Sequence, residues 1–87
     1  MNNIQLYNDY QHDTMIERLQ SVFEYNHGKL ICSLDVQNNF KVSQRTAFRW
    51  LNNMSNVGLM NKITDLDSRK IYFIATRPID TPVWEYL

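Results

Sequence analysis

Few residues of this sequence have the types and the spacing that nucleophilic catalysis requires. His27 and Cys32 are five positions apart, so an imidazole and a thiol could form a nucleophile pair. Leu30 and Ile31 precede the thiol, however, and an apolar setting of this kind is typical of a small buried residue. We therefore predict that the protein is not an enzyme.

Residues that could bind a metal ion are equally sparse. His12 and Asp13 have no second pair of ligands near them in the sequence. Asp65 and Asp67 have the spacing of a calcium loop, but the glycine and the terminal glutamate of that loop are missing. With one cysteine and two glycines in the chain, neither a cysteine-based zinc site nor a glycine-rich phosphate loop is available. The sequence therefore predicts no cofactor and no metal, and it makes no small-molecule ligand evident.

The polar side chains that follow Ser43 have a different chemistry, because several of them form paired hydrogen bonds with flat groups. The arginine fork fits the edge of guanine, and the amides of asparagine and glutamine fit adenine. A threonine methyl group or a phenylalanine ring can contact the methyl group of thymine. The set consists of Gln44, Arg45, Arg49 and Asn52 together with the apolar Phe48, and it extends to Thr46 and Asn53 at its edges. An ordinary solvent-exposed helix face carries similar residue types. The surrounding elements must therefore decide between a DNA-reading face and a merely solvent-exposed one.

A helix is predicted from Ser43 to about Asn56, and it carries this polar set. Ser43 is a good N-cap, because its hydroxyl can accept from a free backbone N–H of the first turn. Gly58 follows the segment and ends it. One stripe of inward-facing residues runs through the helix at helical spacing: Ala47, Trp50, Leu51 and Met54. The polar set then faces outward, although Phe48 could instead pack on the first helix or at a dimer contact.

An earlier helix is predicted over residues 14–26. Its apolar stripe consists of Met15, Ile16, Leu19, Val22 and Phe23. Thr14 and Glu17 have the spacing of a capping box, which predicts that the helix begins there. Gly28 follows, where a left-handed residue commonly ends a helix. Residues 1–13 are expected to form an N-terminal arm or a leading turn.

Between these two helices the sequence predicts a short strand and a short helix. Residues 29–32 are largely apolar and too few for a helix, so we expect a strand there. Ser33 is the expected N-cap of a helix from Leu34 to Phe40. Its predicted buried residues are Leu34, Val36 and Phe40. The pair Lys41-Val42 forms a tight connection to the helix that starts at Ser43.

Two strand-like runs complete the predicted fold. Leu59–Thr64 and Arg69–Thr76 flank the polar stretch 65–68, which is typical of a β-hairpin turn. The whole order indicates an α+β protein with three helices, a short strand and a C-terminal hairpin. Because 87 residues are too few for two cores, residues 1–87 are expected to form a single domain. Two helices joined by a short turn and followed by a hairpin define a winged helix-turn-helix.

The C-terminal tail, residues 78–87, carries several large apolar side chains beyond the hairpin. Such surface tends to find a partner. The tail either folds back on the first helix or crosses to a second subunit, and we expect a homodimer through the first helix or this tail. No membrane association is expected, because no apolar run approaches the length of a bilayer span. The single thiol and the lack of a secretory signal pattern favour a cytoplasmic location.

Charge is unevenly distributed although the formal net charge is zero. Residues 1–40 contain two basic and five acidic side chains, a net of −3, and residues 78–87 add −2. Residues 41–77 contain seven basic and two acidic side chains, a net of +5. Lys62, Arg69 and Lys70 lie in the predicted hairpin, where phosphates of a bound duplex would lie. Asp65 and Asp67 oppose this interpretation, unless they form the turn and point away from the backbone of the nucleic acid.

Much of this region follows a sequence pattern known from other proteins. The run from Phe40 to Leu51 (Phe-Lys-Val-Ser-Gln-Arg-Thr-Ala-Phe-Arg-Trp-Leu), followed by Val57-Gly58-Leu59-Met60, resembles the winged helix-turn-helix of prokaryotic and phage transcription regulators. In that family a Gly-Val-Ser-x-Arg-Thr-Val-x-Arg-x-Leu run enters the recognition helix, and a Gly-Leu-Ile step leads into the wing. The resemblance covers about residues 30–76. It departs at Lys41, where the family usually has glycine and where a left-handed lysine would cost about 1 kcal/mol.

The resemblance implies that residues at the start of the recognition helix contact DNA: Ser43, Gln44, Arg45, Thr46 and Arg49. From the outward face and the hairpin we add Phe48, Asn52, Lys62, Arg69 and Lys70 as expected DNA-binding residues. The expected function is sequence-specific binding of double-stranded DNA by a small transcriptional regulator, with repression the expected mode. Two alternatives stay open, a winged-helix module that binds only proteins and an accessory factor of DNA replication or recombination.

Overall fold

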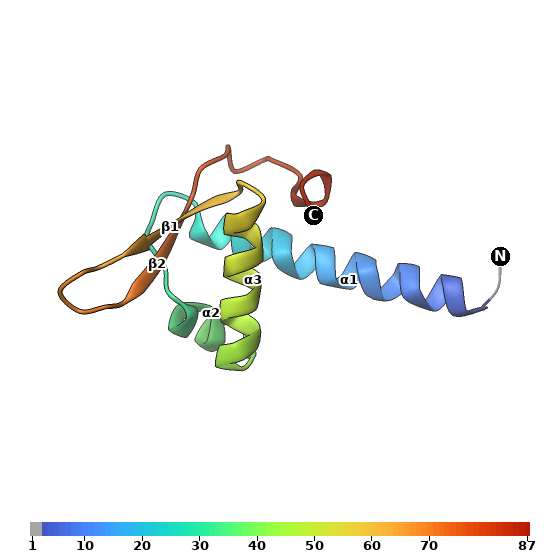
Figure 1. The fold of residues 1–87 in the computed structure, drawn as a ribbon. Helices are drawn as coiled ribbons and strands as arrows, with labels where there is room; N and C mark the ends of the chain where they lie inside the picture. Colours follow the sequence, from blue (N-terminus) through green and yellow to red (C-terminus); the bar gives the residue numbers. More distant parts are fainter. Residues whose placement is uncertain (1–2) are drawn as a thin grey trace.

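The computed structural model describes the backbone of residues 3–87 and the side chains of residues 15–87. Three α-helices and one two-stranded antiparallel sheet form an α+β fold, as predicted (Figure 1). The elements in chain order are α1 (Asn3–Asn26), α2 (Ser33–Phe40), α3 (Gln44–Asn56), β1 (Met60–Thr64), β2 (Ile71–Ala75) and the short 3-10 helix η1 (Val83–Glu85).

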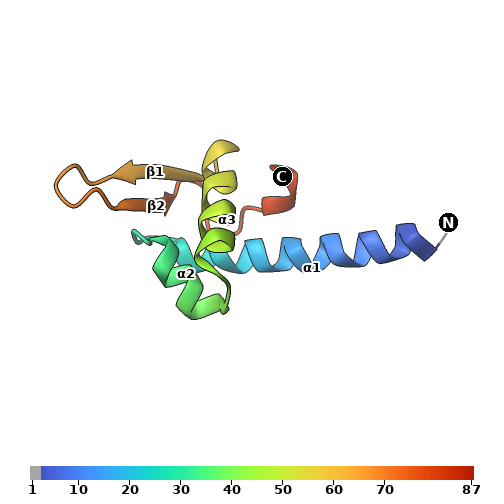
Figure 2. The ribbon, with the colours of Figure 1, turned by 60° about the horizontal axis from the view of Figure 1, so that its bottom comes forward.

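The first helix is longer than predicted. α1 begins at Asn3, so Thr14 lies within the helix and does not cap it, and the expected arm over 1–13 is wrong from residue 3 onward. The reason is that neither glycine nor proline occurs before Gly28, so nothing in the sequence stops the helix from extending backwards. The N-terminal part of α1 runs past the other elements, away from the hairpin (Figures 1 and 2). Met15 of the predicted stripe is accordingly 40% exposed.

The core lies where α1, α3 and the base of the hairpin meet. Leu19, Val22 and Phe23 of α1 are buried as predicted, and Gly28 adopts the expected left-handed conformation with φ 78°. The predicted inward stripe of α3 is also buried: Ala47, Trp50, Leu51 and Met54. Phe73 from β2 and Val36 from α2 are fully buried in the same core. The second helix and the hairpin are therefore fixed on one packed unit.

The predicted strand at 29–32 is reduced to one bridge between Ile31 and Phe73. The two residues exchange backbone hydrogen bonds of 2.9 and 2.7 Å. Cys32 then takes the N-cap position, one residue before the predicted cap, and its N–H donates to Asp35 Oδ2 at 2.9 Å. Leu34 is 57% exposed, contrary to prediction. Two positions on a helix differ by about 200°, so Leu34 faces outward when Val36 faces the core.

A left-handed residue connects α2 to α3. Lys41 has φ 56° and ψ 49°, and its N–H donates to the carbonyl of Gln37 at 3.0 Å. Ser43 caps α3 as predicted, because its Oγ accepts from the N–H of Thr46 at 3.2 Å. The connection between α2 and α3 is therefore short although a lysine stands where glycine is the easier residue.

The hairpin follows α3 directly, and its register pairs Met60 with Ala75 and Thr64 with Ile71. The turn is closed by the N–H of Asp65, which donates to the carbonyl of Lys70 at 2.8 Å. β2 begins at Ile71, two residues later than predicted, because Arg69 is left-handed with φ 59° and cannot continue a strand.

The tail folds back on α1, which is one of the two arrangements expected from the sequence. Gln20 forms two hydrogen bonds to the tail: its Nε2 donates to the carbonyl of Thr81 at 3.1 Å, and its Oε1 accepts from the N–H of Val83 at 3.0 Å. The side chain of Val83 is fully buried. Trp84 and Ile79 remain 58% and 51% exposed, so the tail still presents apolar surface.

Candidate nucleic-acid interface

The outward face of α3 carries two arginines and two asparagines. At about 100° per residue, the face opposite the buried stripe holds positions 45, 49, 52 and 56. Arg45 and Arg49 are exposed, and Asn52 is half-buried. The three side chains predicted to read base edges from this face, Arg45, Arg49 and Asn52, therefore lie in one line along the helix.

The first turn of α3 uses part of its polar set for capping. Besides accepting from the Thr46 N–H, the Ser43 hydroxyl donates to Thr46 Oγ1 at 3.1 Å. These two hydroxyls thus fix the start of the helix and each other. Gln44 is exposed and faces the hairpin side, where it lines a hollow together with Arg69 and Lys70. Of the polar residues predicted at this turn, Gln44 is therefore the one that lies close to the hairpin.

Phe48 joins α3 to the hairpin. Its ring is half-buried and meets the ring of Phe73 edge to face, with centroids 6.1 Å apart and an interplanar angle of 77°. Neither of the two alternative positions considered from the sequence, against α1 or at a dimer contact, describes this packing. A contact between Phe48 and a nucleic acid stays a prediction, and it would involve only the exposed part of the ring.

Lys62 extends from β1 to the same face. Its Nζ donates to Asn52 Oδ1 at 3.1 Å and lies 5.3 Å from the centroid of the Phe48 ring. One predicted cation and one predicted base-reading amide are thus already paired in the free protein. The pairing places positive charge beside the middle of α3, because Lys62 sits near the base of the hairpin rather than at its tip.

The carboxylate of Asp65 holds the hairpin turn. Its Oδ2 accepts from the hydroxyl of Ser68 at 2.8 Å, and its Oδ1 accepts from the N–H of Asp67 at 3.0 Å. The Ser68 hydrogen bond, followed by that from Asp67, lowers the pKa of Asp65 below its usual value of 3.8. Asp65 is therefore a turn-forming residue, as the sequence suggested, and Leu66 beside it is 88% exposed.

A hollow of about 290 Å³ lies between the start of α2, α3 and the hairpin, and we call it the α2–hairpin hollow. Its lining residues are Cys32, Ser33, Leu34, Gln44, Phe48, Arg69, Lys70 and Ile71. Two cations face this space beside the first turn of α2, where the Asp35 carboxylate already accepts from the Cys32 N–H. The contribution of α2 to this hollow was not predicted from the sequence. Ser33 was recognised there only as a cap, and no local pattern links it to residues 36 positions later.

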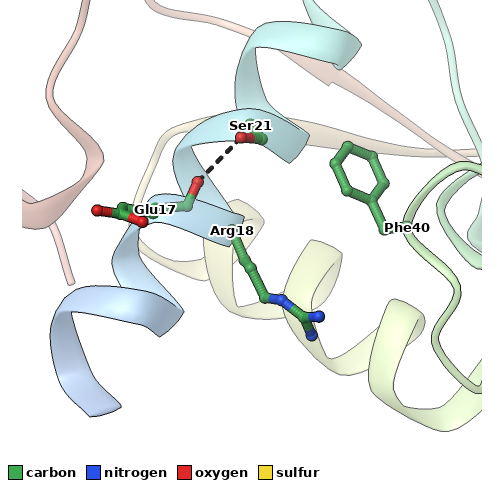
Figure 3. A pocket seen from close by; sticks show the side chains of 4 residues that line it. All are labelled: Glu17, Arg18, Ser21 and Phe40. Carbon is green, nitrogen blue, oxygen red and sulfur yellow. Dashed lines mark hydrogen bonds between the residues drawn. The ribbon is translucent and has the colours of Figure 1, made fainter. Parts of the chain in front are cut away.

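A second hollow, of about 300 Å³, lies between α1 and the end of α2 (Figure 3). The Ser21 hydroxyl there donates to the carbonyl of Glu17 at 3.0 Å, a bond within one turn of α1. Glu17 and Arg18 leave α1 in different directions, and Phe40 stands across from them (Figure 3). The Arg18 guanidinium lies 6.0 Å from the centroid of the Trp50 ring, so this side chain reaches across to α3.

The two residues considered for catalysis, His27 and Cys32, have structural partners, whereas the side chains of His12 and Asp13, considered for metal binding, lie outside the described residues. The His27 ring lies within hydrogen-bond distance of the Arg77 carbonyl, at 3.2 Å, and Cys32 caps α2. Among the described residues no three histidine, cysteine or acidic side chains gather closely enough to hold a metal ion. Over the same part of the chain, no helix has both the length and the apolar character that crossing a membrane requires.

Comparison with known proteins finds no relative that defines a family. No protein-family model matches the chain, and neither curated proteins nor solved structures give a significant match. Function must therefore be argued from the residues themselves.

Proposed function

We propose that this protein is a winged helix-turn-helix protein that binds double-stranded DNA in a sequence-specific manner, as a small transcriptional regulator. The observation that carries the proposal is the outward face of α3. There Arg45, Arg49 and Asn52 line one side of a helix that is rigidly packed and follows a short turn after α2. A rigid helix with fork-shaped and amide side chains along one face has the geometry for reading the major groove.

In this proposal the hairpin supplies contacts to the phosphate backbone. Arg69 and Lys70 are exposed beside the start of α2, so a phosphate in the α2–hairpin hollow would meet two cations. The Asp65 carboxylate is directed at its own turn by two hydrogen bonds, which supports the view that it is turned away from a bound duplex. The segment 41–77, with a net charge of +5, contains every one of these groups.

Fluorescence anisotropy with labelled duplexes that tile the region upstream of the protein's own gene tests the proposal. We expect saturable binding to one duplex, with an affinity that falls steeply as salt increases because several phosphates are contacted. Arg45→Ala and Arg49→Ala should each weaken specific binding by about 1–3 kcal/mol. Unchanged affinity in both variants would refute the role of α3.

Arg77→Ala is a matched control for these variants. It also removes an arginine from the segment 41–77, but this guanidinium lies 5.6 Å from the Tyr86 ring and its Nε donates to the Gly58 carbonyl, at the far end of α3. Its effect on specific binding should be small. Equal binding to scrambled duplexes would instead support an accessory role in replication or recombination, the alternative that also binds DNA.

A protein-interaction module is the second candidate, and the outer side of the hairpin favours it. Lys62 and Phe73 face α3, so their neighbours Ile63 and Tyr72 in the register face away from it. Ile63 is 42% exposed, and Leu66 at the turn is 88% exposed. If no duplex binds even at low salt, this apolar strip becomes the leading candidate for a functional surface.

We also propose that the protein pairs as a homodimer, through α1 or the C-terminal tail, to read two half-sites. The exposed Trp84 and Ile79 of the tail support this, and so does the part of α1 that extends past the other elements (Figure 2). Light scattering coupled to size exclusion should give twice the chain mass at micromolar concentration. A monomer mass over the whole accessible concentration range would contradict pairing.

A further inference from the structure

A groove of about 330 Å³ separates α1 from the second half of α3 and is closed at one end by the end of the tail. We call it the α1–α3 groove. Its apolar walls are Met15, Ile16 and Leu19 from α1, Trp50 from α3 and Leu87 from the tail. Met15 and Leu87 are 40% and 41% exposed, so the groove leaves apolar surface open to solvent. A volume near 300 Å³ with such walls is at the lower end of the range for small-molecule sites.

The polar residues of the groove are concentrated on α3. Arg49 and Asn53 both line it, and because they are four positions apart they lie one above the other on the helix. The Arg18 guanidinium adds a second positive charge close by, 6.0 Å from the centroid of the Trp50 ring. The groove therefore combines apolar walls with one guanidinium group and one amide, and the Arg18 guanidinium belongs to the neighbouring hollow between α1 and the end of α2.

The indole of Trp50 adds an independent observation. Trp50 is only 4% exposed, and its Nε1 is buried without a hydrogen-bond partner in the described structure. Buried donors of this kind are rare, since leaving one unsatisfied costs about 1–3 kcal/mol. Trp50 also lines the groove, so this unpaired donor belongs to a residue of the site.

We propose that the α1–α3 groove binds a small carboxylic acid with an aliphatic or aromatic body. The apolar body lies against Met15, Leu19 and the Trp50 ring. The carboxylate pairs with the Arg49 guanidinium, and the Asn53 amide donates a further hydrogen bond. Charge complementarity selects this occupant, since an uncharged apolar molecule would leave the arginine without a counter-charge.

The position of Arg49 gives the ligand a regulatory consequence, which rests on the proposed function. Arg49 belongs both to the outward face of α3 and to the lining of the groove. A guanidinium paired with a bound carboxylate is withdrawn from the base edges that it would otherwise contact. The acid is therefore a ligand that weakens DNA binding.

Tryptophan fluorescence provides a direct test that needs no DNA. The chain has two tryptophans, so Trp84→Phe leaves Trp50 as the only reporter. Decanoate is the probe, and decanol is the uncharged control with the same alkyl body. We expect a saturable change in Trp50 emission with decanoate. Decanol should bind with an affinity at least about tenfold lower, because it cannot form the charge-assisted hydrogen bond.

Two variants in the Trp84→Phe background make the test specific. Arg49→Gln should weaken decanoate binding by about tenfold or more, whereas Lys29→Gln, which removes an exposed cation over the Tyr25 ring, should leave it unchanged. Circular dichroism confirms that both variants are folded. Equal responses to decanoate and decanol, no response to either, or full binding by Arg49→Gln would each overturn the proposal.

A second copy of the chain is the other conceivable occupant, and the same sample distinguishes it. In that case Trp50 emission without any probe would change as the chains pair with rising protein concentration, and the proposed ligand would be wrong. Pairing through another part of α1 or of the tail leaves this emission unchanged. The link to DNA is tested separately, with decanoate added to the protein–duplex complex. Failure of DNA binding alone leaves the fluorescence result intact, so the two proposals fail independently.

Discussion

An acidic residue at the turn of a basic hairpin illustrates how local hydrogen bonds decide the role of a charged side chain. From the sequence, Asp65 opposes phosphate binding. In the structure, however, both of its carboxylate oxygens accept hydrogen bonds from residues of the same turn, the Ser68 hydroxyl and the Asp67 amide. The charge is used to shape the turn that presents Arg69 and Lys70.

This arrangement makes the hairpin sensitive to acid. The pKa of Asp65 is lower in the folded protein than its usual value of 3.8, so the folded state favours the ionised carboxylate. Its contribution to stability is complete above pH 3.8 and is lost as the pH falls through the lowered pKa. Thermal unfolding of the wild type and of Asp65→Ala should therefore differ most near neutrality, and the difference should shrink below pH 3.8. A difference that stays constant across this range would contradict the assignment.

Helical periodicity predicted which way each side chain of α3 faces, but it did not predict which residues of other elements those side chains contact. The inward stripe of α3 was correctly predicted, and Arg45 and Arg49 are exposed as the same pattern requires. Phe48 lies on the flank of that pattern, where the hairpin covers it, and periodicity within one helix contains no information about a strand 25 residues later. The Lys62–Asn52 hydrogen bond could not be predicted for the same reason.

At the scale of elements, a predicted helix boundary was correct where the sequence contains a residue that stops the helical backbone. Ser43 and Gly58 bracket α3 as predicted, because a hydroxyl cap and a left-handed glycine both stop the backbone pattern locally. The start of α1 was predicted from Thr14 and Glu17, two residues that can cap a helix but do not prevent one from continuing. The predicted start of α1 was therefore wrong, because residues that can cap a helix need not end it where no glycine or proline interrupts the pattern.

The connection between α2 and α3 carries a measurable strain. Lys41 is left-handed, which costs about 1–2 kcal/mol for a residue with a Cβ atom. Lys41→Gly removes this cost but gives the unfolded chain more freedom, worth about 0.4–1 kcal/mol. We expect a net stabilisation of about 0.5–1 kcal/mol in the free energy of unfolding by urea.

Lys41→Ala is the control for this prediction, because it removes the charge but keeps the Cβ atom. It should not stabilise the protein. If alanine and glycine stabilised it equally, the cause would be loss of the lysine charge rather than relief of backbone strain.

At the scale of the whole molecule, the hairpin and the N-terminal end of α1 point in opposite directions from the packed helices (Figure 2). The molecule is accordingly elongated, with dimensions of 53 × 27 × 19 Å. The excess of positive charge lies in the segment that forms α3 and the hairpin, and most acidic residues lie in α1 and the tail. The order of elements and this polarity could be predicted from the sequence, because both follow from local composition.

The sequence could not decide between the two expected arrangements of the tail, because the docking on α1 involves one polar side chain in the middle of that helix. Gln20 donates to the Thr81 carbonyl and accepts from the Val83 N–H, and it thereby holds residues more than 60 positions away. We expect Gln20→Ala to reduce the free energy of unfolding by about 1–3 kcal/mol, because both backbone groups lose their partner beside the buried Val83.

The matched control for Gln20→Ala is Thr81→Ala, which keeps the backbone carbonyl that Gln20 contacts. Its effect on stability should stay within about 0.5 kcal/mol. Urea unfolding of both variants, followed by circular dichroism, provides the comparison. If Gln20→Ala were as mild as Thr81→Ala, burial of Val83 alone would hold the tail. The α1–α3 groove, which Leu87 closes, would then keep its shape without the glutamine.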